Sequence, residues 1–123
     1  MRVIWVAACL LAIPLQRGGE PSYLRDVRPI LDNNCTSCHQ PASRQSDLDL
    51  TTYDRFQAGG KRGPAFVPGS PDQSLVIQFI TASLKPAMPF GQPLLAAHDV
   101  SIIREWIQLG ARDDSPSETT TGS

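Results

Sequence analysis

This chain of 123 residues lacks several features that define whole classes of protein. It has no excess of positive charge, with 11 basic residues against 12 acidic ones, which argues against binding to nucleic acid through the phosphates. It has no internal repeat and no apolar run of the ~20 residues that a membrane-spanning helix needs. Its length is that of one domain.

Large apolar side chains and long regular segments are also limited. The chain is 41% hydrophobic and 19% charged, as in soluble globular proteins, which excludes collagen-like, coiled-coil and wholly disordered chains. With 11 prolines and 9 glycines, much of the fold should be irregular loop. Small loop-rich folds usually need a metal, a disulfide or a cofactor to supplement their core.

The N-terminus reads as a targeting segment. Arg2 precedes an apolar run, Val3–Ile13, which is too short to span a membrane and fits the central region of a signal peptide. We expect residues 1–19 to direct export to the periplasm or another extracytoplasmic compartment. Two alternatives stay open: a buried helix of the mature protein, and lipidation at Cys9, where Val6–Cys9 resembles a lipoprotein box and would anchor the chain to a membrane.

Hydrophobic periodicity predicts a small number of short helices. The strongest pattern is Ala97–Leu109, with Gly110 as a stop signal. Ser22–Asn34 predicts another helix, capped by Ser22 and interrupted or started in its regular part near Pro29. Two further segments are a helix that starts at Ser70–Gln73 through a capping box and fades near 81–83, and a helical turn at Thr52–Phe56.

The strongest chemical signal is the motif Cys35-Thr36-Ser37-Cys38-His39. Cys-x-x-Cys-His is the attachment signature of c-type haem, in which two thioethers hold the porphyrin and the adjacent imidazole binds the iron. A disulfide or redox dithiol, and a zinc site that needs two more ligands, are the alternatives.

Candidates for a second axial ligand are few. Beyond Met1 the chain has one methionine, Met88, and beyond His39 it has one histidine, His98. Met88 lies between prolines in a loop, where a thioether could reach an iron, although an isolated methionine is more often a core residue. His98 lies at the expected start of the last helix and remains the alternative ligand.

Several segments, in order, resemble the planctomycete-type cytochrome c domains of the class I cytochrome c fold. The resemblance extends from about Tyr23 to Ala111. The matching segments are Asp26–Leu31, Cys35–His39, Leu48–Leu50, Gly59-Gly60, Val67–Pro71 with Ser74-Leu75, Met88-Pro89, and Ile103–Ile107 with Gly110-Ala111. The chain departs from the family at Ala96, where a threonine usually caps the last helix.

The resemblance implies an all-α, small cytochrome c-like fold of three to four short helices and long loops around one covalent haem c. It implies haem attachment at Cys35 and Cys38, with His39 as the proximal and Met88 as the distal iron ligand. The haem domain would span residues 22–112, and the polar residues 113–123 would form a disordered tail.

In such a fold the first and last helices pack together. The expected contacts join Val27, Ile30 and Leu31 to Ile103, Trp106 and Ile107, and the candidate haem-wall residues are Leu48, Leu50, Phe56, Phe66, Phe79 and Phe90. Three cations, Arg55, Lys61 and Arg62, are candidate partners of the haem propionates, or simply solvated loop residues.

The favoured function is an exported electron carrier without catalytic residues, which exchanges single electrons with redox protein partners. One alternative is a haem peroxidase or gas sensor with an open or labile sixth ligand. Another is a haem-bearing subunit or module of a larger dehydrogenase. The sequence names neither the electron donor nor the acceptor.

Overall fold

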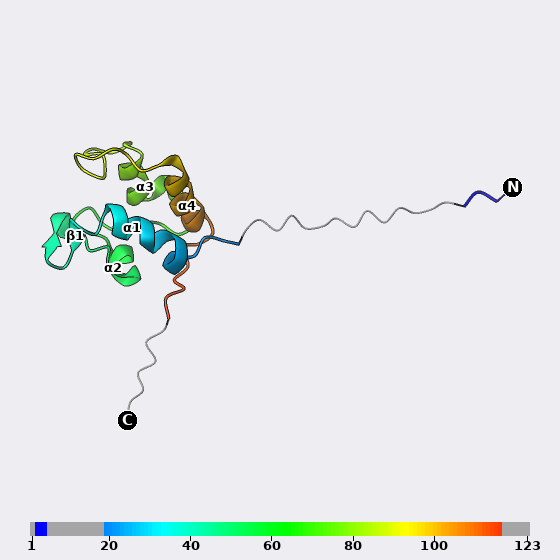
Figure 1. Ribbon diagram of the computed structural model, residues 1–123, viewed down its shortest axis with the longest axis horizontal. Helices are drawn as coiled ribbons and strands as arrows, with labels where there is room; N and C mark the ends of the chain where they lie inside the picture. The colour runs from blue at the N-terminus through cyan, green and yellow to red at the C-terminus, as the bar shows by residue number, and fades with distance from the viewer. Residues whose placement is uncertain (1, 5–18, 117–123) are drawn as a thin grey trace, which may run out of the picture.

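A computed structural model describes residues 2–4 and 19–116, and Figure 1 shows that the latter form a helix-rich domain. The elements are η1 (Tyr23–Val27), α1 (Arg28–Asn34), β1 (His39–Gln40), β2 (Ser43–Arg44), η2 (Gln45–Asp47), α2 (Tyr53–Ala58), η3 (Pro71–Gln73), α3 (Leu75–Ile80) and α4 (Ala97–Gln108). The helix-rich prediction is confirmed, but β1 and β2 form a small antiparallel sheet that an all-α fold does not contain. Most of the expected signal peptide, including Cys9, and residues 117–123 of the expected tail lie outside the described residues.

The first helix forms as predicted, in two parts. The Ser22 hydroxyl accepts a hydrogen bond from the Arg25 backbone N–H at 3.1 Å, which caps the first turn. That turn, η1, is π-helical, and the regular helix α1 begins at Arg28. Pro29 lies in the first turn of α1, where its missing N–H costs no helical hydrogen bond.

The helix predicted from Ser70 is interrupted by a serine. Ser70 makes no side-chain cap, so the predicted capping box is wrong, and a 3₁₀ turn, η3, replaces the first helical turn. Ser74 is fully buried, and its hydroxyl donates to the Ser70 carbonyl and accepts from the Val67 N–H, both at 2.9 Å. These local bonds compete with the helix, which therefore starts only at Leu75.

The last helix closely follows its prediction. Helix α4 ends at Gln108, and Gly110 follows with a φ of 109°, a conformation that other residues rarely adopt. Its residues Ile103, Trp106 and Ile107 are buried in the core, where they join Val27, Ile30 and Leu31 from η1 and α1. The expected pairing of first and last helices is present.

Five aromatic residues form the centre of this core. The Trp106 ring lies 5.1 to 6.1 Å, between ring centroids, from the rings of Tyr23, Tyr53, Phe56 and Phe66. Burial raises the pKa of Tyr23 to about 12, because ionisation in this apolar setting is costly. The cluster brings together residues from η1, α2, α4 and the loop before η3.

The segment after α4 is bound to this cluster. The Tyr53 hydroxyl donates to the Ala111 carbonyl at 2.7 Å, and the Trp106 indole N–H donates to the Arg112 carbonyl at 3.0 Å. These bonds satisfy two polar groups that would otherwise be costly inside an aromatic core.

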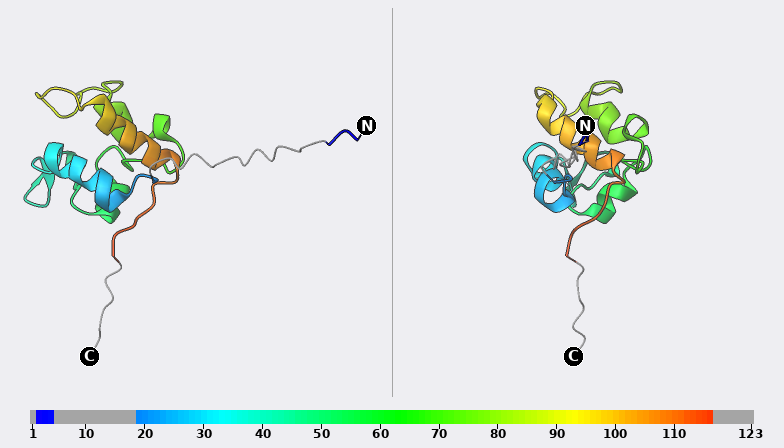
Figure 2. Two further views of the ribbon diagram at one scale, coloured as in Figure 1. Left: turned by 45° about the vertical axis from the view of Figure 1, so that its right-hand side comes forward. Right: turned by 90° about the vertical axis from the view of Figure 1, so that its right-hand side faces the viewer.

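The same segment reaches the start of η1. The Asp114 carboxylate accepts hydrogen bonds from the Ser22 hydroxyl and from the Leu24 N–H, the latter at 2.9 Å. Hydrogen bonding from Ser22 lowers the pKa of Asp114. Figure 2 shows that both ends of the described domain leave from the same side. Asp114 belongs to the expected tail, yet its carboxylate contacts the first helix.

Candidate functional site

The Cys-x-x-Cys-His motif follows directly on α1. The Cys35 N–H donates to the Leu31 carbonyl at 2.7 Å, which extends the helical pattern by one residue. The N–H groups of Cys38 and His39 then both donate to the Cys35 carbonyl, at 3.2 and 3.1 Å. The motif is therefore a tight turn that brings both cysteines and the histidine together at the end of α1.

The two thiols are in different environments. Cys35 is half-buried, Cys38 is exposed, and neither forms a disulfide. Burial, with a smaller contribution from Cys38, raises the pKa of the Cys35 thiol to about 11. Because neither sulfur is in a disulfide, both are available for other covalent bonds.

His39 is held in one orientation by the backbone around it. The residue is buried, and its Nδ1 donates to the Gln45 carbonyl at 3.1 Å. Because a carbonyl only accepts, Nδ1 carries a proton, and in the neutral imidazole Nε2 then keeps its lone pair. A histidine that ligates a metal through Nε2 usually has its other ring nitrogen bound in this way.

The loop after His39 folds back over it. Residues of β1 and β2 pair, with His39 opposite Arg44, and the Gln45 N–H donates to the Cys38 carbonyl at 3.2 Å. The His39 carbonyl in turn accepts from the Leu50 N–H at 2.8 Å. Backbone hydrogen bonds therefore fix the chain from Cys38 to Leu50 around the backbone of His39.

A buried carboxylate stabilises the end of this loop. Asp49 is 2% exposed, and its Oδ1 accepts from the N–H and the hydroxyl of Thr51, at 2.9 and 2.6 Å. Burial alone would raise the pKa of Asp49, but these hydrogen bonds and the nearby Arg55, with Nε 3.4 Å from Oδ2, hold it below its usual range. Sequence reasoning missed this role, although Asp-x-Thr is the signal of such a turn.

Met88 lies on the loop between α3 and α4. Its N–H donates to the Phe79 carbonyl at 3.0 Å, and the Leu84 N–H donates to the Gln78 carbonyl, also at 3.0 Å. The Met88 side chain is partly buried against the core. The loop is thus bound to carbonyls of the last turn of α3, where a helix end leaves acceptors for other N–H groups.

The two sets of predicted ligands lie at the same end of the domain. In Figure 1, and again in the left view of Figure 2, the yellow-green loop that contains Met88 lies across from the cyan segment with β1. The other candidate ligand, His98, is exposed at the start of α4.

The candidate wall residues divide into three groups. Leu50, Phe56 and Phe66 are buried, Leu48 and Phe79 are half-buried, and Phe90 is 75% exposed. Phe90 and the half-exposed Leu94 both lie on the loop after Met88. These two exposed apolar side chains are therefore available to cover an apolar group bound near Met88.

The three candidate propionate partners differ in their contacts. Arg55 pairs with Asp49, whereas the Arg62 guanidinium lies over the Phe79 ring, 5.1 Å from its centroid. The Lys61 side chain is in no ion pair among the described residues.

These observations fit a covalently attached haem. Two unpaired thiols at the required spacing, an imidazole with Nε2 free, and a thioether on a facing loop form a donor set suited to haem iron. Within residues 19–116, no group of three or more His, Cys, Asp or Glu side chains gathers as it would around a bare metal ion. Among the helices of the described residues, none is long and apolar enough to cross a membrane.

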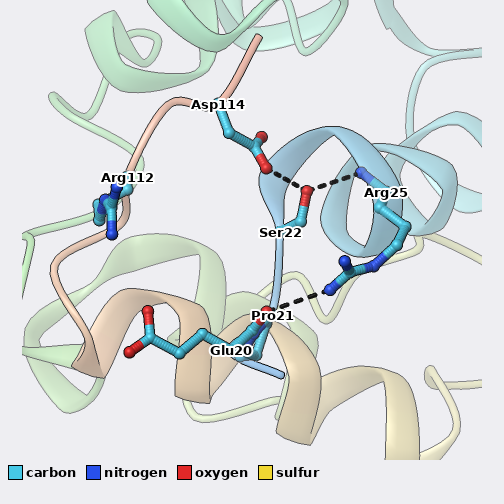
Figure 3. Close-up of a pocket in the computed structure, with 6 residues that line it drawn as sticks. All are labelled: Glu20, Pro21, Ser22, Arg25, Arg112 and Asp114. Atoms are coloured by element: carbon cyan, nitrogen blue, oxygen red, sulfur yellow. Dashed lines mark hydrogen bonds between the residues drawn. The ribbon is translucent and has the colours of Figure 1, made fainter. Parts of the chain in front are cut away.

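A small pocket lies at the other end of η1 and α1 (Figure 3). It is lined by Glu20, Pro21, Ser22, Arg25, Arg112 and Asp114. Its polar groups largely satisfy one another, as the Arg25 bond to the Glu20 carbonyl at 3.1 Å and the Ser22 bond to Asp114 show. It contains none of the predicted haem residues, so we regard it as part of the junction between the two ends of the domain.

The part of the chain that contains the Cys-x-x-Cys-His motif is similar to a known protein family. Residues 35–89 match the family described as planctomycete cytochrome C, which confirms the resemblance found in the sequence and supports a c-type cytochrome with covalent haem. No curated protein matches this chain. A solved structure, the hydrazine synthase of Kuenenia stuttgartiensis, is similar at 25% identity and a TM-score of 0.46 over 76% of this chain, which spans 16% of that chain.

Proposed function

With residues 35–89 assigned to the planctomycete cytochrome C family, we propose that this protein is an exported monohaem cytochrome c that carries single electrons between redox protein partners. The observation that carries the proposal is the orientation of His39. Its Nδ1–H is bound by the Gln45 carbonyl inside the Cys-x-x-Cys-His turn, which leaves Nε2 as a ligand beside the two thiols.

Each residue of the site has a defined role. The Cys35 and Cys38 thiols would hold the porphyrin through thioethers, each thiol adding its sulfur and its hydrogen to the two carbons of one vinyl group. His39 would ligate the iron through Nε2, and Met88 would ligate it through its thioether. The haem, when bound, supplies the one-electron couple between ferrous and ferric iron.

The hydrogen bond at His39 also affects the electron affinity of the site. A donated Nδ1–H makes the imidazole a better electron donor, which favours ferric iron, whereas a thioether ligand favours the ferrous state. If His39 and Met88 both ligate the iron, no position is left on it for a substrate, so the role that we propose is that of an electron carrier.

The first experiment is a pyridine haemochrome assay with reduced-minus-oxidised spectra, on the full chain expressed with a periplasmic cytochrome maturation system. We expect one covalent haem per chain, lost in the double variant Cys35→Ser/Cys38→Ser. A wild-type chain that matures without haem would contradict the proposal and favour thiol redox or zinc chemistry.

A second experiment identifies the distal ligand. Met88→Ala should lose the sulfur-to-iron charge-transfer band and lower the potential, and His98→Ala is the matched control because His98 is exposed. If His98→Ala changes the spectrum and Met88→Ala does not, His98 takes the distal role. Rapid binding of carbon monoxide by the untreated ferrous protein would favour a sensor or peroxidase with a labile sixth ligand.

Export is part of the proposal and has its own measurement. The intact mass of protein purified from the periplasm should correspond to a chain cut near residue 19, with the processed form absent from the cytoplasm. A mass with two or three acyl chains and a new N-terminus at Cys9 would instead indicate a lipid-anchored cytochrome.

A further inference from the structure

We propose that Arg62 is a positioning residue for Met88: its contact with the Phe79 ring ties the loop that contains the distal ligand to the loop around His39. The two segments are far apart in the sequence, and the contact adds to the hydrogen bond that the Val76 N–H donates to the Ala65 carbonyl at 2.8 Å, near the start of α3. The inference rests on the proposed function, in which His39 and Met88 bind the same iron.

The first half of the connection starts at the proximal histidine. The Gln45 carbonyl holds His39 Nδ1, and the next residue, Ser46, accepts from the Lys61 N–H at 2.9 Å. The turn that contains Lys61 and Arg62 is thereby fixed to the backbone beside the imidazole.

The turn from Gly60 to Gly63 is held close to the Ser46 backbone. Gly60 and Gly63 pair with each other through two hydrogen bonds, of 3.3 and 3.0 Å, so Lys61 and Arg62 form a tight tip. A Cβ on Gly60 would collide with the Ser46 carbonyl oxygen. Only glycine allows so close an approach, and the position of Arg62 follows from it.

The second half of the connection runs through α3. The Arg62 guanidinium lies over the half-buried Phe79 ring, 5.1 Å from the centroid, within the range of a cation–π interaction. Arg62 is in no ion pair among the described residues, so this ring is its assigned partner. The carbonyl of the same Phe79 holds the Met88 N–H at 3.0 Å.

The consequence concerns the lability of the distal ligand. Loss of the Arg62–Phe79 contact should let the end of α3 and the Met88 loop move relative to the His39 loop. An external ligand would then displace the thioether from ferric iron more easily. This makes Arg62 a determinant of how firmly the sixth position is closed.

The experiment measures imidazole binding to the ferric holoprotein, followed by loss of the sulfur-to-iron band. Arg62→Gln should raise the imidazole affinity about two- to fivefold. Lys61→Gln is the matched control, because it removes the same charge from the same turn but not the contact with the ring, so Arg62→Gln should raise the affinity more than Lys61→Gln does. Arg62→Lys keeps a cation over the ring and should largely restore the wild-type value.

A double-mutant cycle links the effect to the ring. Phe79→Leu keeps the backbone carbonyl and an apolar side chain but removes the aromatic face, so it should match Arg62→Gln. The combined variant should show no further increase. Equal effects of Arg62→Gln and Lys61→Gln, or full additivity with Phe79→Leu, would overturn the inference and indicate a simple charge effect.

Hydrogen exchange gives a readout that does not depend on ligand binding. In Arg62→Gln the Met88 amide of the ferrous protein should exchange faster, while the amide of Ile107 in the core should exchange at the wild-type rate. Faster exchange at both sites would show general destabilisation and reject a positioning role. If the wild type lacks the sulfur-to-iron band, the proposed ligation fails, whereas the Met88 amide still tests the contact itself.

Discussion

At one end of the domain, four aromatic rings from two helices and a loop surround Trp106, whereas at the end with Cys35, His39 and Met88 the chain is fixed mainly by backbone hydrogen bonds. We call these the aromatic end and the ligand end. The aromatic end owes its stability to burial of side chains, which tolerates little change in volume. The ligand end depends on carbonyls and N–H groups in short loops, and so places its ligands with few buried side chains.

The largest expected effect is at the aromatic end. Trp106→Ala removes the ring that contacts all four others and should lower the free energy of unfolding by about 3–5 kcal/mol, measured by urea denaturation of the holoprotein. Trp106→Phe, which keeps a ring, should cost less and remain folded if the alanine variant does not. A loss below about 1 kcal/mol in Trp106→Ala would mean that the cluster is not the main source of stability.

The next effect is at the ligand end and depends on pH. Asp49→Asn should destabilise the protein by about 1–3 kcal/mol at neutral pH, because it removes a charged acceptor from buried hydrogen bonds. The folded-state pKa of Asp49 is lowered, so this stability is fully present above the unfolded pKa of about 3.9 and is lost as the pH falls through the folded value. Urea unfolding at several pH values should show the two proteins converging in acid.

The control for that measurement is Asp54→Asn, whose residue is exposed on α2. Its difference from the wild type should be small at all pH values. An Asp49→Asn deficit that grows in acid would contradict the assigned hydrogen bonds.

A smaller effect should appear where the two ends of the domain meet. Asp114→Ala removes the acceptor of the Leu24 N–H and of the Ser22 hydroxyl, and should cost about 1 kcal/mol, typical of a lost helix cap. Asp113→Ala is the matched control, since within the described part of the chain its carboxylate accepts from the nearby Ser115 N–H and makes no bond to η1. Equal thermal midpoints of the two variants would argue against the contact with η1.

The smallest effect on stability is expected from the exposed ring of the ligand end. Phe90→Ser should change the free energy of unfolding by no more than about 0.5 kcal/mol, because the side chain is 75% exposed. The measurement tests the sequence-based interpretation that the Phe90 side chain lines the haem. A loss comparable with that of Trp106→Phe, together with a shifted haem spectrum, would show that the ring packs on the cofactor.

The sequence predicted the aromatic end better than the ligand end. The periodic apolar residues of α4 and of Ser22–Asn34 indicated two helices and their buried faces. A stripe of large apolar side chains on one side of a helix is removed from water when that side packs against the core. The Cys-x-x-Cys-His spacing also indicated its chemistry directly.

What the sequence did not reveal depends on contacts between distant residues. No local pattern indicates that Ser74 bonds to the Val67 backbone and shortens a helix, or that Arg62 lies over Phe79. The bond from His39 Nδ1 to the Gln45 carbonyl likewise involves a backbone atom, which any residue at that position would supply. Only the folded loops bring these partners together.

The bond between Ser22 and Asp114 has a consequence for how this unit can be combined with others. It brings the points where the chain enters and leaves the domain to one side, away from the ligand end (Figure 2). A linker joined at either point would therefore leave the ligand-bearing loops uncovered. Such geometry suits a module that can be tethered, fused or inserted into a larger polypeptide while its ligand end still faces outward.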